Sequence, residues 1–145
     1  MKVFFDTSVL IAASLLQHEH HVPSADVYSK ADKKTASCSA HTLAEVYSGL
    51  TRMPAPQRMG ADQALLLLDQ IRERLTVITL NEEDYYSAIA SAVAQGIVGG
   101  MIYDALLAKC ALKANATIIY TWDVDHFRRL GPEVARRVRT PMRHL

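Results

Sequence analysis

Four acidic residues are spread along the chain, each at a point where a strand ends or a helix begins. Asp6 follows an apolar run, and Asp123 follows a second one. Glu45 and Asp104 lie in the early turns of two expected helices. In a parallel α/β sheet the carboxyl ends of the strands meet at one edge, where ligands bind. The pattern therefore predicts that these four carboxylates converge on one site.

Carboxylates crowded together repel one another and raise each other's pKa unless a multivalent cation holds them. Oxygen donors favour Mg²⁺ or Mn²⁺, both of which keep several of their waters when bound. Such ions neutralise a scissile phosphate and lower the pKa of a bound water, which supports in-line hydrolysis of a phosphodiester. The acids thus predict a Mg²⁺ or Mn²⁺ site, with one ion or two.

Each acid also has a simpler interpretation. Asp6 suits a helix N-cap, and Glu45 suits a solvated helix acid or a capping-box partner. Asp104 lies in a very apolar segment, where an unpaired charge is costly, so it needs a basic residue, helix N–H groups or a metal cation. Lys109 is five positions on, which is a poor spacing for pairing within one helix.

The elements that would position these acids alternate along the chain. Apolar runs predict strands before Asp6 and at residues 35–39, 75–80 and 117–120, with a last edge strand at 139–141. Helical spacing and caps predict helices at 7–16, 25–33, 40–52, 61–74, 85–95 and 105–112, with a short turn at 131–137. This order indicates a three-layer α/β/α sandwich with a mainly parallel sheet of four to five strands.

Length and composition indicate a globular protein. The chain has 145 residues, of which 50% are hydrophobic and 21% are charged, so we expect a single compact domain over residues 1–145. The apolar N-terminal run is too short for a signal peptide or a membrane span. Cys38 and Cys110 lie in apolar surroundings and are expected to be small buried hydrophobes, as in a reducing compartment. We therefore expect a cytoplasmic protein with no membrane segment.

Charge is distributed unevenly along the chain. Residues 1–125 carry ten Lys or Arg against fourteen Asp or Glu, whereas residues 126–145 carry six Arg against one Glu. Guanidinium groups suit phosphate oxygens, so this end offers candidates for an RNA-binding rim: Arg128, Arg129, Arg136 and Arg137. The alternative is an ordinary solvated surface. The histidines at 18, 20 and 21 lack the one-face spacing of a helical metal site.

Four motifs together resemble the PIN-domain ribonucleases, and within them the VapC toxins of bacterial toxin–antitoxin pairs. The motifs occur in order over nearly the whole chain: Phe4-Phe5-Asp6-Thr7-Ser8, Ala44-Glu45-Val46-Tyr47, Tyr103-Asp104-Ala105-Leu106-Leu107-Ala108 and Thr121-Trp122-Asp123-Val124-Asp125-His126-Phe127. By this resemblance, the family's acidic quartet corresponds to Asp6, Glu45, Asp104 and Asp123.

The resemblance carries further expectations. It implies that Thr7 or Thr121 orients ligands or water, and that the substrate is RNA. Asp125 is an extra acid and an alternative fourth ligand, although the Thr-x-Asp spacing after Thr121 favours Asp123. The resemblance also implies a homodimer and a cognate antitoxin whose C-terminal segment blocks the acidic cleft.

Two other functions compete with this hypothesis. Aspartyl phosphotransferases also place an Asp after an apolar first strand, but they usually need a second Asp two residues on, where this chain has Ser8. A PIN-like fold could also be retained as a non-catalytic interaction module. Four acids without a metal would be a costly cluster in such a module, so the sequence favours the nuclease. Its target RNA and cleavage position stay open.

Overall fold

The computed structural model describes residues 2–142 and contains a five-stranded sheet in which every pair of neighbouring strands is parallel. The strands are β1 (Val3–Phe5), β2 (Ala36–Ser39), β3 (Thr76–Ile78), β4 (Ile118–Tyr120) and β5 (Val138–Arg139). Their order in the sheet is β3-β2-β1-β4-β5. The central strand is therefore β1, and the predicted parallel sheet is confirmed.

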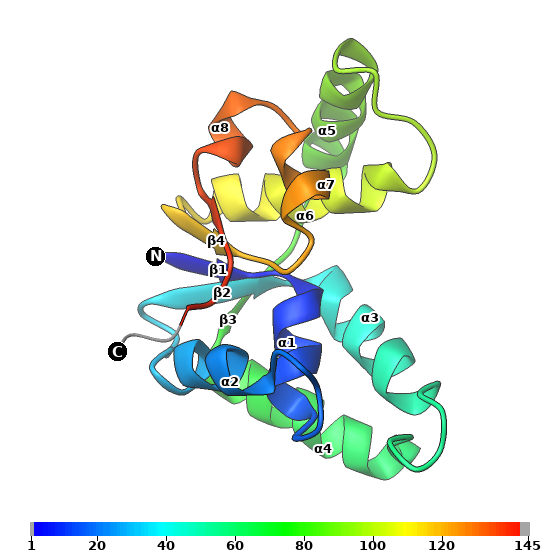
Figure 1. Ribbon diagram of the computed structural model, residues 1–145. Coiled ribbons are helices and arrows are strands. Elements are labelled where there is room, and N and C mark those ends of the chain that lie inside the picture. The colour runs from blue at the N-terminus through cyan, green and yellow to red at the C-terminus, as the bar shows by residue number, and fades with distance from the viewer. Residues whose placement is uncertain (1, 143–145) are drawn as a thin grey trace.

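Helices cover both faces of the sheet (Figure 1). One layer contains α1 (Thr7–Ser14), α2 (His21–Ser29), α3 (Ala40–Thr51) and α4 (Ala61–Arg74). The other contains α5 (Glu82–Ala94), α6 (Met101–Lys113), α7 (Val124–Arg128) and α8 (Pro132–Ala135). This is the predicted three-layer sandwich. Within the part of the chain that the structure describes, no helix has both the length and the apolar character needed to cross a bilayer.

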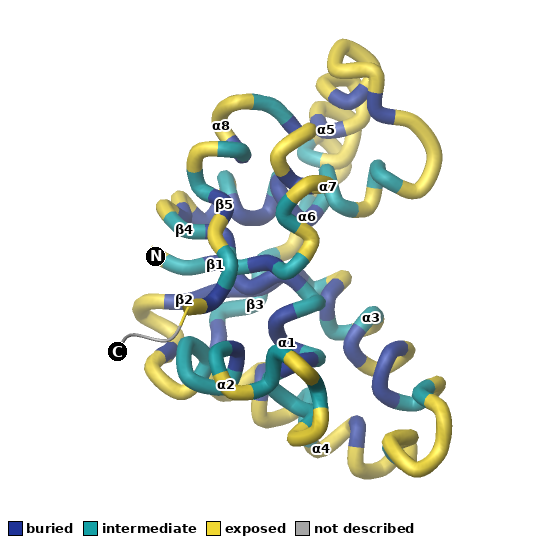
Figure 2. The backbone as a smooth tube through the Cα atoms, in the orientation of Figure 1, coloured by how far each residue is buried: buried dark blue, intermediate teal, exposed yellow. Residues whose placement is uncertain are grey.

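Two hydrophobic clusters, one on each side of the sheet, hold the layers together. Successive strand residues point to opposite faces, so Phe4 packs with the α5–α8 layer and Phe5 packs with the α1–α4 layer. Figure 2 shows β2 as buried and the other strands as a mixture that is mostly buried or intermediate. Cys38 and Cys110 are free and buried, as predicted, one in each cluster. Asp6, which directly follows Phe5, is consequently fixed at the end of a fully buried strand.

The connection from α5 to α6 delivers Asp104 to the sheet edge. Asn81 caps α5: its Oδ1 accepts from Asp84 N at 2.8 Å, and its own N–H donates to Asp84 Oδ2 at 3.0 Å. Lys113 of α6 pairs with Asp84 at 2.7 Å and joins the two helices. Between the helices, Gly96 and Gly99 have φ values of 72° and 64°, which glycine adopts without a steric penalty.

The predicted elements differ from the structure in several bounds and in one helix among the described residues. Helix α6 begins at Met101, four residues before the expected start, and α5 begins at Glu82, three residues before it. No helix was expected directly after residue 123, but α7 begins there, and its five residues are too few to show a periodic apolar pattern. Helix α2 begins at His21, four residues before the expected start. Pro23 lies in its first turn, where a missing backbone N–H costs nothing.

Candidate active site

Asp6 lies at the carboxyl end of the central strand and is 3% exposed. It occupies the N-cap position of α1, but its side chain makes no capping hydrogen bond. Instead, the Thr121 hydroxyl donates to Asp6 Oδ2 at 2.7 Å, and the Ser8 hydroxyl donates to the same oxygen at 2.8 Å. The simple helix-cap interpretation is therefore wrong, because two hydroxyls hold this carboxylate in a fixed orientation.

The same two hydroxyls also hold the segment that carries Asp123. Thr121 Oγ1 accepts from the backbone N–H of Asp123 at 2.9 Å, and Ser8 Oγ accepts from the backbone N–H of Trp122 at 3.0 Å. The β4–α7 connection is thereby tied to Asp6. Thr121 was a candidate from the sequence. Ser8 was mentioned only because it stands where an aspartyl phosphotransferase would have its second Asp. Its position two residues after Asp6 was the available signal.

A chain of hydroxyls leads to Glu45. Ser39 caps α3, accepting from Thr42 N at 2.9 Å, and its hydroxyl lies 3.0 Å from Thr42 Oγ1. Thr7 Oγ1 lies 3.0 Å from Thr42 Oγ1 and donates to Glu45 Oε1 at 2.9 Å. Because each hydroxyl has one proton, this donation requires Thr42 to donate to Thr7. Glu45 is therefore oriented by Thr7 and is not the capping-box partner of Ser39.

Asp104 lies in the first turn of α6 and faces a histidine from α7. His126 Nδ1 is 3.8 Å from Asp104 Oδ2, a contact that sequence reasoning missed together with α7. Lys109 does not reach Asp104 and instead contacts Ser87 Oγ at 3.5 Å. Across residues 2–142, no Lys or Arg forms an ion pair with any of the four acids.

The negative charges of the four acids act on one another. Burial raises the pKa of Asp6 to about 6; hydrogen bonds from Thr121 and Ser8 oppose the rise, and the charges of Asp123 and Asp104 add to it. Burial also raises the pKa of Asp104; His126 opposes that rise, while Asp123 and Glu45 add to it.

Asp6 and Asp123 directly follow the neighbouring strands β1 and β4, so both lie at the carboxyl edge of the sheet. Thr121 joins them, because its hydroxyl donates to Asp6 Oδ2 and accepts from Asp123 N. No hydrogen bond within residues 2–142 links Asp125 to Asp6 in this way.

The donor set fits a hard divalent cation. Among the described residues, including the histidines at 18, 20 and 21, no group of three His, Cys, Asp or Glu side chains is arranged to hold a metal ion by itself. Mg²⁺ does not need one, because it usually takes one or two protein carboxylates and completes its shell with water and substrate phosphate. The carboxylates at this edge have no Lys or Arg partner within residues 2–142 and so provide such oxygens.

The four candidate arginines fall into two groups. Arg128 ends α7 and Arg129 follows it; both are exposed and lie close to His126 in the chain. Arg136 and Arg137 each pair with Glu133 of α8 at 3.0 Å. Arg137 directly precedes β5 and so lies at the amino edge of the parallel sheet. The structure does not bring Arg136 and Arg137 to the acids.

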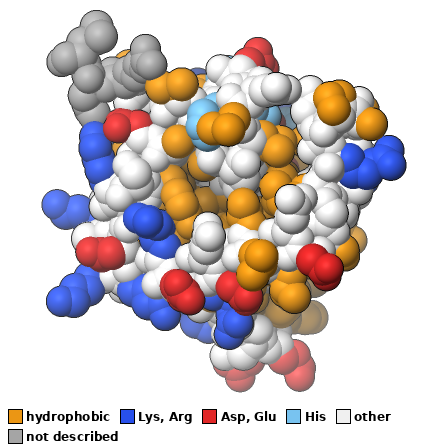
Figure 3. Space-filling view, turned by 90° about the horizontal axis from the view of Figure 1, so that it is seen from below, with side chains coloured by type: hydrophobic (Ala, Val, Ile, Leu, Met, Phe, Trp, Pro, Cys, Tyr) orange, Lys and Arg blue, Asp and Glu red, His pale blue; other side chains and the backbone are white. Residues whose placement is uncertain are grey.

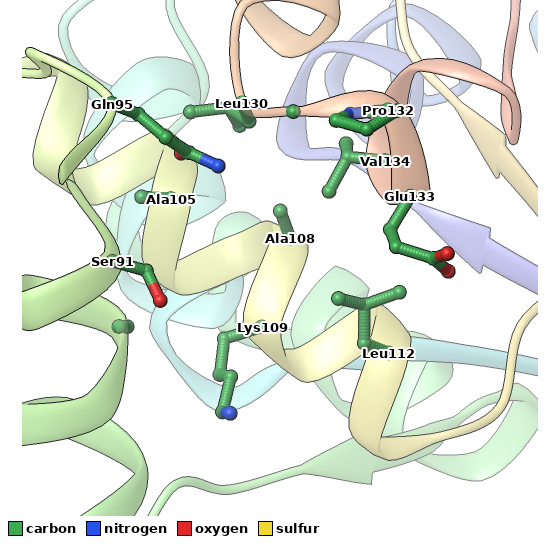
Figure 4. A pocket seen from close by; sticks show the side chains of 12 residues that line it. Ser91, Gln95, Ala105, Ala108, Lys109, Leu112, Leu130, Pro132, Glu133 and Val134 are labelled. Atoms are coloured by element: carbon green, nitrogen blue, oxygen red, sulfur yellow. The ribbon is translucent and has the colours of Figure 1, made fainter.

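Other concave surfaces lie away from the acids. A pocket of about 190 Å³ opens between α5, α6 and the start of α8 (Figure 4), and none of the four acids lines it. A larger groove, of about 600 Å³, lies between the end of α1 and the α3–α4 connection and is lined by Leu15, Leu16, Met53 and Pro54, among others. Seen from the α1–α4 side, the molecule is hollowed, with hydrophobic side chains in the hollow (Figure 3).

Comparisons with known proteins agree with this geometry. The profile of the PIN domain matches residues 3–132. Ribonuclease VapC27 of Mycobacterium tuberculosis is 36% identical over 133 residues, covering 89% of this chain and 92% of the relative. Ribonuclease VapC40 of the same species is 31% identical over 132 residues, covering 89% of this chain and 94% of the relative.

Solved structures share the fold. VapC20 of Mycobacterium tuberculosis, described as a sarcin-ricin loop cleaving toxin, superposes with a TM-score of 0.70 at 18% identity, covering 86% of this chain and 92% of that one. VapBC2 of Rickettsia felis, bound to a DNA fragment from its promoter, superposes with a TM-score of 0.66 at 20% identity, covering 97% and 98%. Together with the sequence relatives, these findings establish that the chain belongs to the PIN-domain family and, within it, to the VapC ribonucleases.

Proposed function

We propose that Asp6, Glu45, Asp104 and Asp123 form the active site of a Mg²⁺- or Mn²⁺-dependent endoribonuclease that acts as the toxin of a type II toxin–antitoxin pair. The chain is a nuclease because it belongs to the VapC ribonucleases, and divalent metal use is typical of that family. The observation that supports the choice of residues is the hydroxyl network at the carboxyl edge of the sheet, in which Thr121 joins Asp6 to Asp123 and Thr7 orients Glu45. A cluster of carboxylates is stable at neutral pH when a cation compensates it.

The protein's own side chains have distinct tasks in this proposal. Thr121 and Ser8 fix Asp6, and Thr121 also fixes the backbone of Asp123. Thr7 donates a hydrogen bond to Glu45 Oε1. The other carboxylate oxygen, Oε2, then accepts a proton from the attacking water. That water's oxygen bonds to phosphorus as the bond to the leaving sugar oxygen breaks, and the leaving oxygen takes a proton from bulk water.

Metal chemistry complements these tasks. A divalent ion held by Asp6, Asp104 and Asp123, with Glu45 nearby, would supply positive charge to the phosphate and make a bound water more acidic. Arg128 and Arg129 would supply further positive charge, because both are exposed at the end of α7, the helix that follows Asp123.

Cleavage of structured RNAs tests the active site. We expect the protein to cut RNA in Mn²⁺ or Mg²⁺ and not in EDTA, and both Asp104→Asn and Asp123→Asn to lose at least a hundredfold in rate. Asp125→Asn is the matched control for Asp123→Asn. Asp125 lies in the first turn of α7, two residues after Asp123, and both side chains are exposed. The control variant should cut within about threefold of the wild-type rate. Cutting that persists in EDTA, or in Asp104→Asn, would show that these acids are not the catalytic metal ligands.

The groove between α1 and the α3–α4 connection is the surface that we propose for the antitoxin. Leu16 is 83% exposed at its border, and an exposed apolar groove of this size is suited to an apolar helix of a partner. Solved VapBC structures share this fold. Leu16→Glu should weaken capture of the protein encoded by the adjacent gene and leave RNA cleavage unchanged.

The remaining proposals concern the state of the protein in the cell. We propose one domain over residues 1–145, a homodimer and a cytoplasmic location. Large exposed hydrophobic side chains support self-association, since Leu66 is 64% exposed and Val98 is 80% exposed. Buried free thiols at Cys38 and Cys110 suit a reducing compartment. Light scattering on the purified protein measures the dimer directly.

A further inference from the structure

Two pairs of stacked aromatic rings lie at the sheet edge that carries the acids. The rings of His41 and Tyr103 are nearly parallel, with an interplanar angle of 8° and centroids 5.8 Å apart. The rings of His20 and Trp122 are also nearly parallel, at 9°, with centroids 3.7 Å apart. Each pair joins segments that are far apart in the sequence.

The strand order places the two pairs on opposite sides of Asp6. His41 is the second residue after β2, and Trp122 is the second residue after β4. Strand β1, which ends at Asp6, lies between β2 and β4, and neighbouring strands are about 4.8 Å apart. The two pairs therefore bracket the end of β1.

The first pair is also close to two other acids. His41 and Glu45 are four residues apart on α3 and so share one face of that helix. Tyr103 directly precedes Asp104 in the first turn of α6. The His41–Tyr103 pair consequently borders the acidic cluster on its β2 side.

These rings are available to a ligand. His41 is exposed, Tyr103 is 53% exposed, and within residues 2–142 neither side chain makes a hydrogen bond or an ion pair. Parallel rings at 5.8 Å are offset, which leaves part of each ring face open. Trp122 is more constrained, because its Nε1–H donates to Ser24 Oγ at 2.8 Å. His20, stacked on Trp122, keeps 37% of its side chain exposed.

Stacking would solve a binding problem at this edge. The acids repel the phosphate backbone, and two of the four candidate arginines, Arg136 and Arg137, are paired with Glu133 of α8. Aromatic faces bind unpaired bases without relying on charge and without requiring a particular base.

We propose that the His41–Tyr103 and His20–Trp122 pairs are two stacking platforms, which hold the unpaired bases on either side of the scissile phosphate. This inference rests on the proposed ribonuclease function and deepens it by naming the side chains that would bind the bases next to the cut bond. A continuous duplex keeps its bases stacked on one another and would not occupy the platforms.

A double-mutant cycle tests the first platform. The probe is a short single-stranded RNA that the wild-type protein cuts at one mapped bond, together with versions that carry one abasic nucleotide at each position in turn. Tyr103→Ala should lower kcat/KM about tenfold on the intact RNA. One abasic position next to the cut should lower the wild-type value by a similar factor, and combining the two changes should add no further loss.

Matched variants separate stacking from other effects. Tyr103→Phe keeps a ring and should stay within about twofold of wild type, as should Tyr86→Ala, which removes an exposed tyrosine from α5. His20→Ala should couple in the same way to an abasic nucleotide on the other side of the cut. We avoid changing Trp122, because its indole N–H holds α2.

The outcomes distinguish this inference from the proposed function. A wild-type protein that cuts no RNA overturns both. A protein that cuts RNA, but whose Tyr103→Ala and abasic losses simply multiply, overturns the stacking platforms alone. Unchanged kinetics in Tyr103→Ala and His20→Ala would also overturn the stacking platforms alone. That result would indicate that the rings contact another protein and not RNA.

Discussion

At the scale of single residues, Asp6 carries the strongest conflict between stability and function. Its folded-state pKa of about 6 lies above the ordinary value of 3.8, mainly because of burial. The folded protein therefore binds this proton more tightly than the unfolded chain does. The resulting stability is fully present below about pH 4 and is lost as the pH rises through about 6.

Asp6→Asn should consequently stabilise the metal-free protein at neutral pH. Asparagine fills the same space without a charge, and ionising Asp6 at pH 7 costs about 3 kcal/mol in the folded state. In EDTA at pH 7 we expect the variant to unfold at higher urea concentration than wild type, while losing RNA cleavage. Urea melts at pH 4 are the comparison, because there the advantage should largely disappear; an equal advantage at both pH values would contradict the burial argument.

Thr121 provides a second test at this scale. Its buried hydroxyl donates to Asp6 and accepts from Asp123 N. Thr121→Val keeps the shape but leaves both groups without that partner, which should cost about 1–3 kcal/mol of unfolding free energy and at least tenfold in cleavage rate. Thr121→Ser keeps the hydroxyl and should retain most of the activity. A Val variant as active as Ser would show that this hydroxyl positions nothing.

The acids and both threonines could be located from the sequence because each follows a strand or lies in an early turn of a helix. Their catalytic role stays a prediction. Thr42 and His126 could not be predicted, for physical reasons, and the role of Ser8 could be predicted only in part. The bond from Ser8 to Asp6 is local, but Ser8 reaches the backbone N–H of Trp122 only when β1 and β4 are paired. Thr42 meets Thr7 only after α1 and α3 are packed. His126 faces Asp104 only because residues 124–128 form a helix.

At the scale of elements, the long periodic helices and the strands were predictable, whereas the short helix α7 was not. The strands β2 and β4 begin one residue after their predicted starts. Helix α4 has the predicted bounds, Ala61–Arg74, and the Asn81 cap of α5 is present. Helix α7 and the geometry around α8 depend on tertiary contacts. Gly131, at the N-cap of α8, has φ 104°, and a Cβ built there would lie 2.6 Å from Gln95 Nε2.

Gly131→Ala should therefore destabilise the α7–α8 region. The positive φ strains any L side chain, at a cost of about 1–3 kcal/mol, although Gln95 can move aside. Gly100→Ala is the matched control, since Gly100 has φ −64° and open space around its Cα. We expect the first variant to lower Tm by several degrees and the second to leave it unchanged; similar melting temperatures would show that α8 tolerates the strain. Gly131 is not in the proposed site, so cleavage by folded protein should persist.

At the scale of the whole molecule, the described arginines of the basic C-terminal segment do not form one rim. Arg136 and Arg137 pair with Glu133 of α8, whereas Arg128 and Arg129 lie at the end of α7, the helix whose His126 faces Asp104. Composition gives the number of charges along the chain, whereas their distribution in space depends on which element each residue joins.

Replacing Arg128 and Arg129 together by Ala should weaken RNA recognition. The slope of log K against log salt reports the number of phosphate contacts. For a single strand, loss of two contacts should make this slope shallower by about 1.4. We expect kcat/KM to fall at low salt, with little change at high salt. Arg136→Ala is the control and should behave as wild type. A control that falls as far as the double variant would return Arg136 to the RNA surface.

Mn²⁺ and protons should compete for the same carboxylates, and the melting temperature of the whole protein should report that competition. Mn²⁺ stabilises whichever state binds it, and the acids bind it best when they are ionised. Because the pKa of Asp6 is about 6 and burial raises that of Asp104 as well, the Mn²⁺-induced rise in Tm should be small at pH 5 and should grow to several degrees at pH 7.5. Thermal melts with Mn²⁺ or EDTA at each pH measure this directly. The rise should be largely lost in Asp6→Asn and kept in Asp125→Asn; a rise that is the same at both pH values would place the ion away from Asp6.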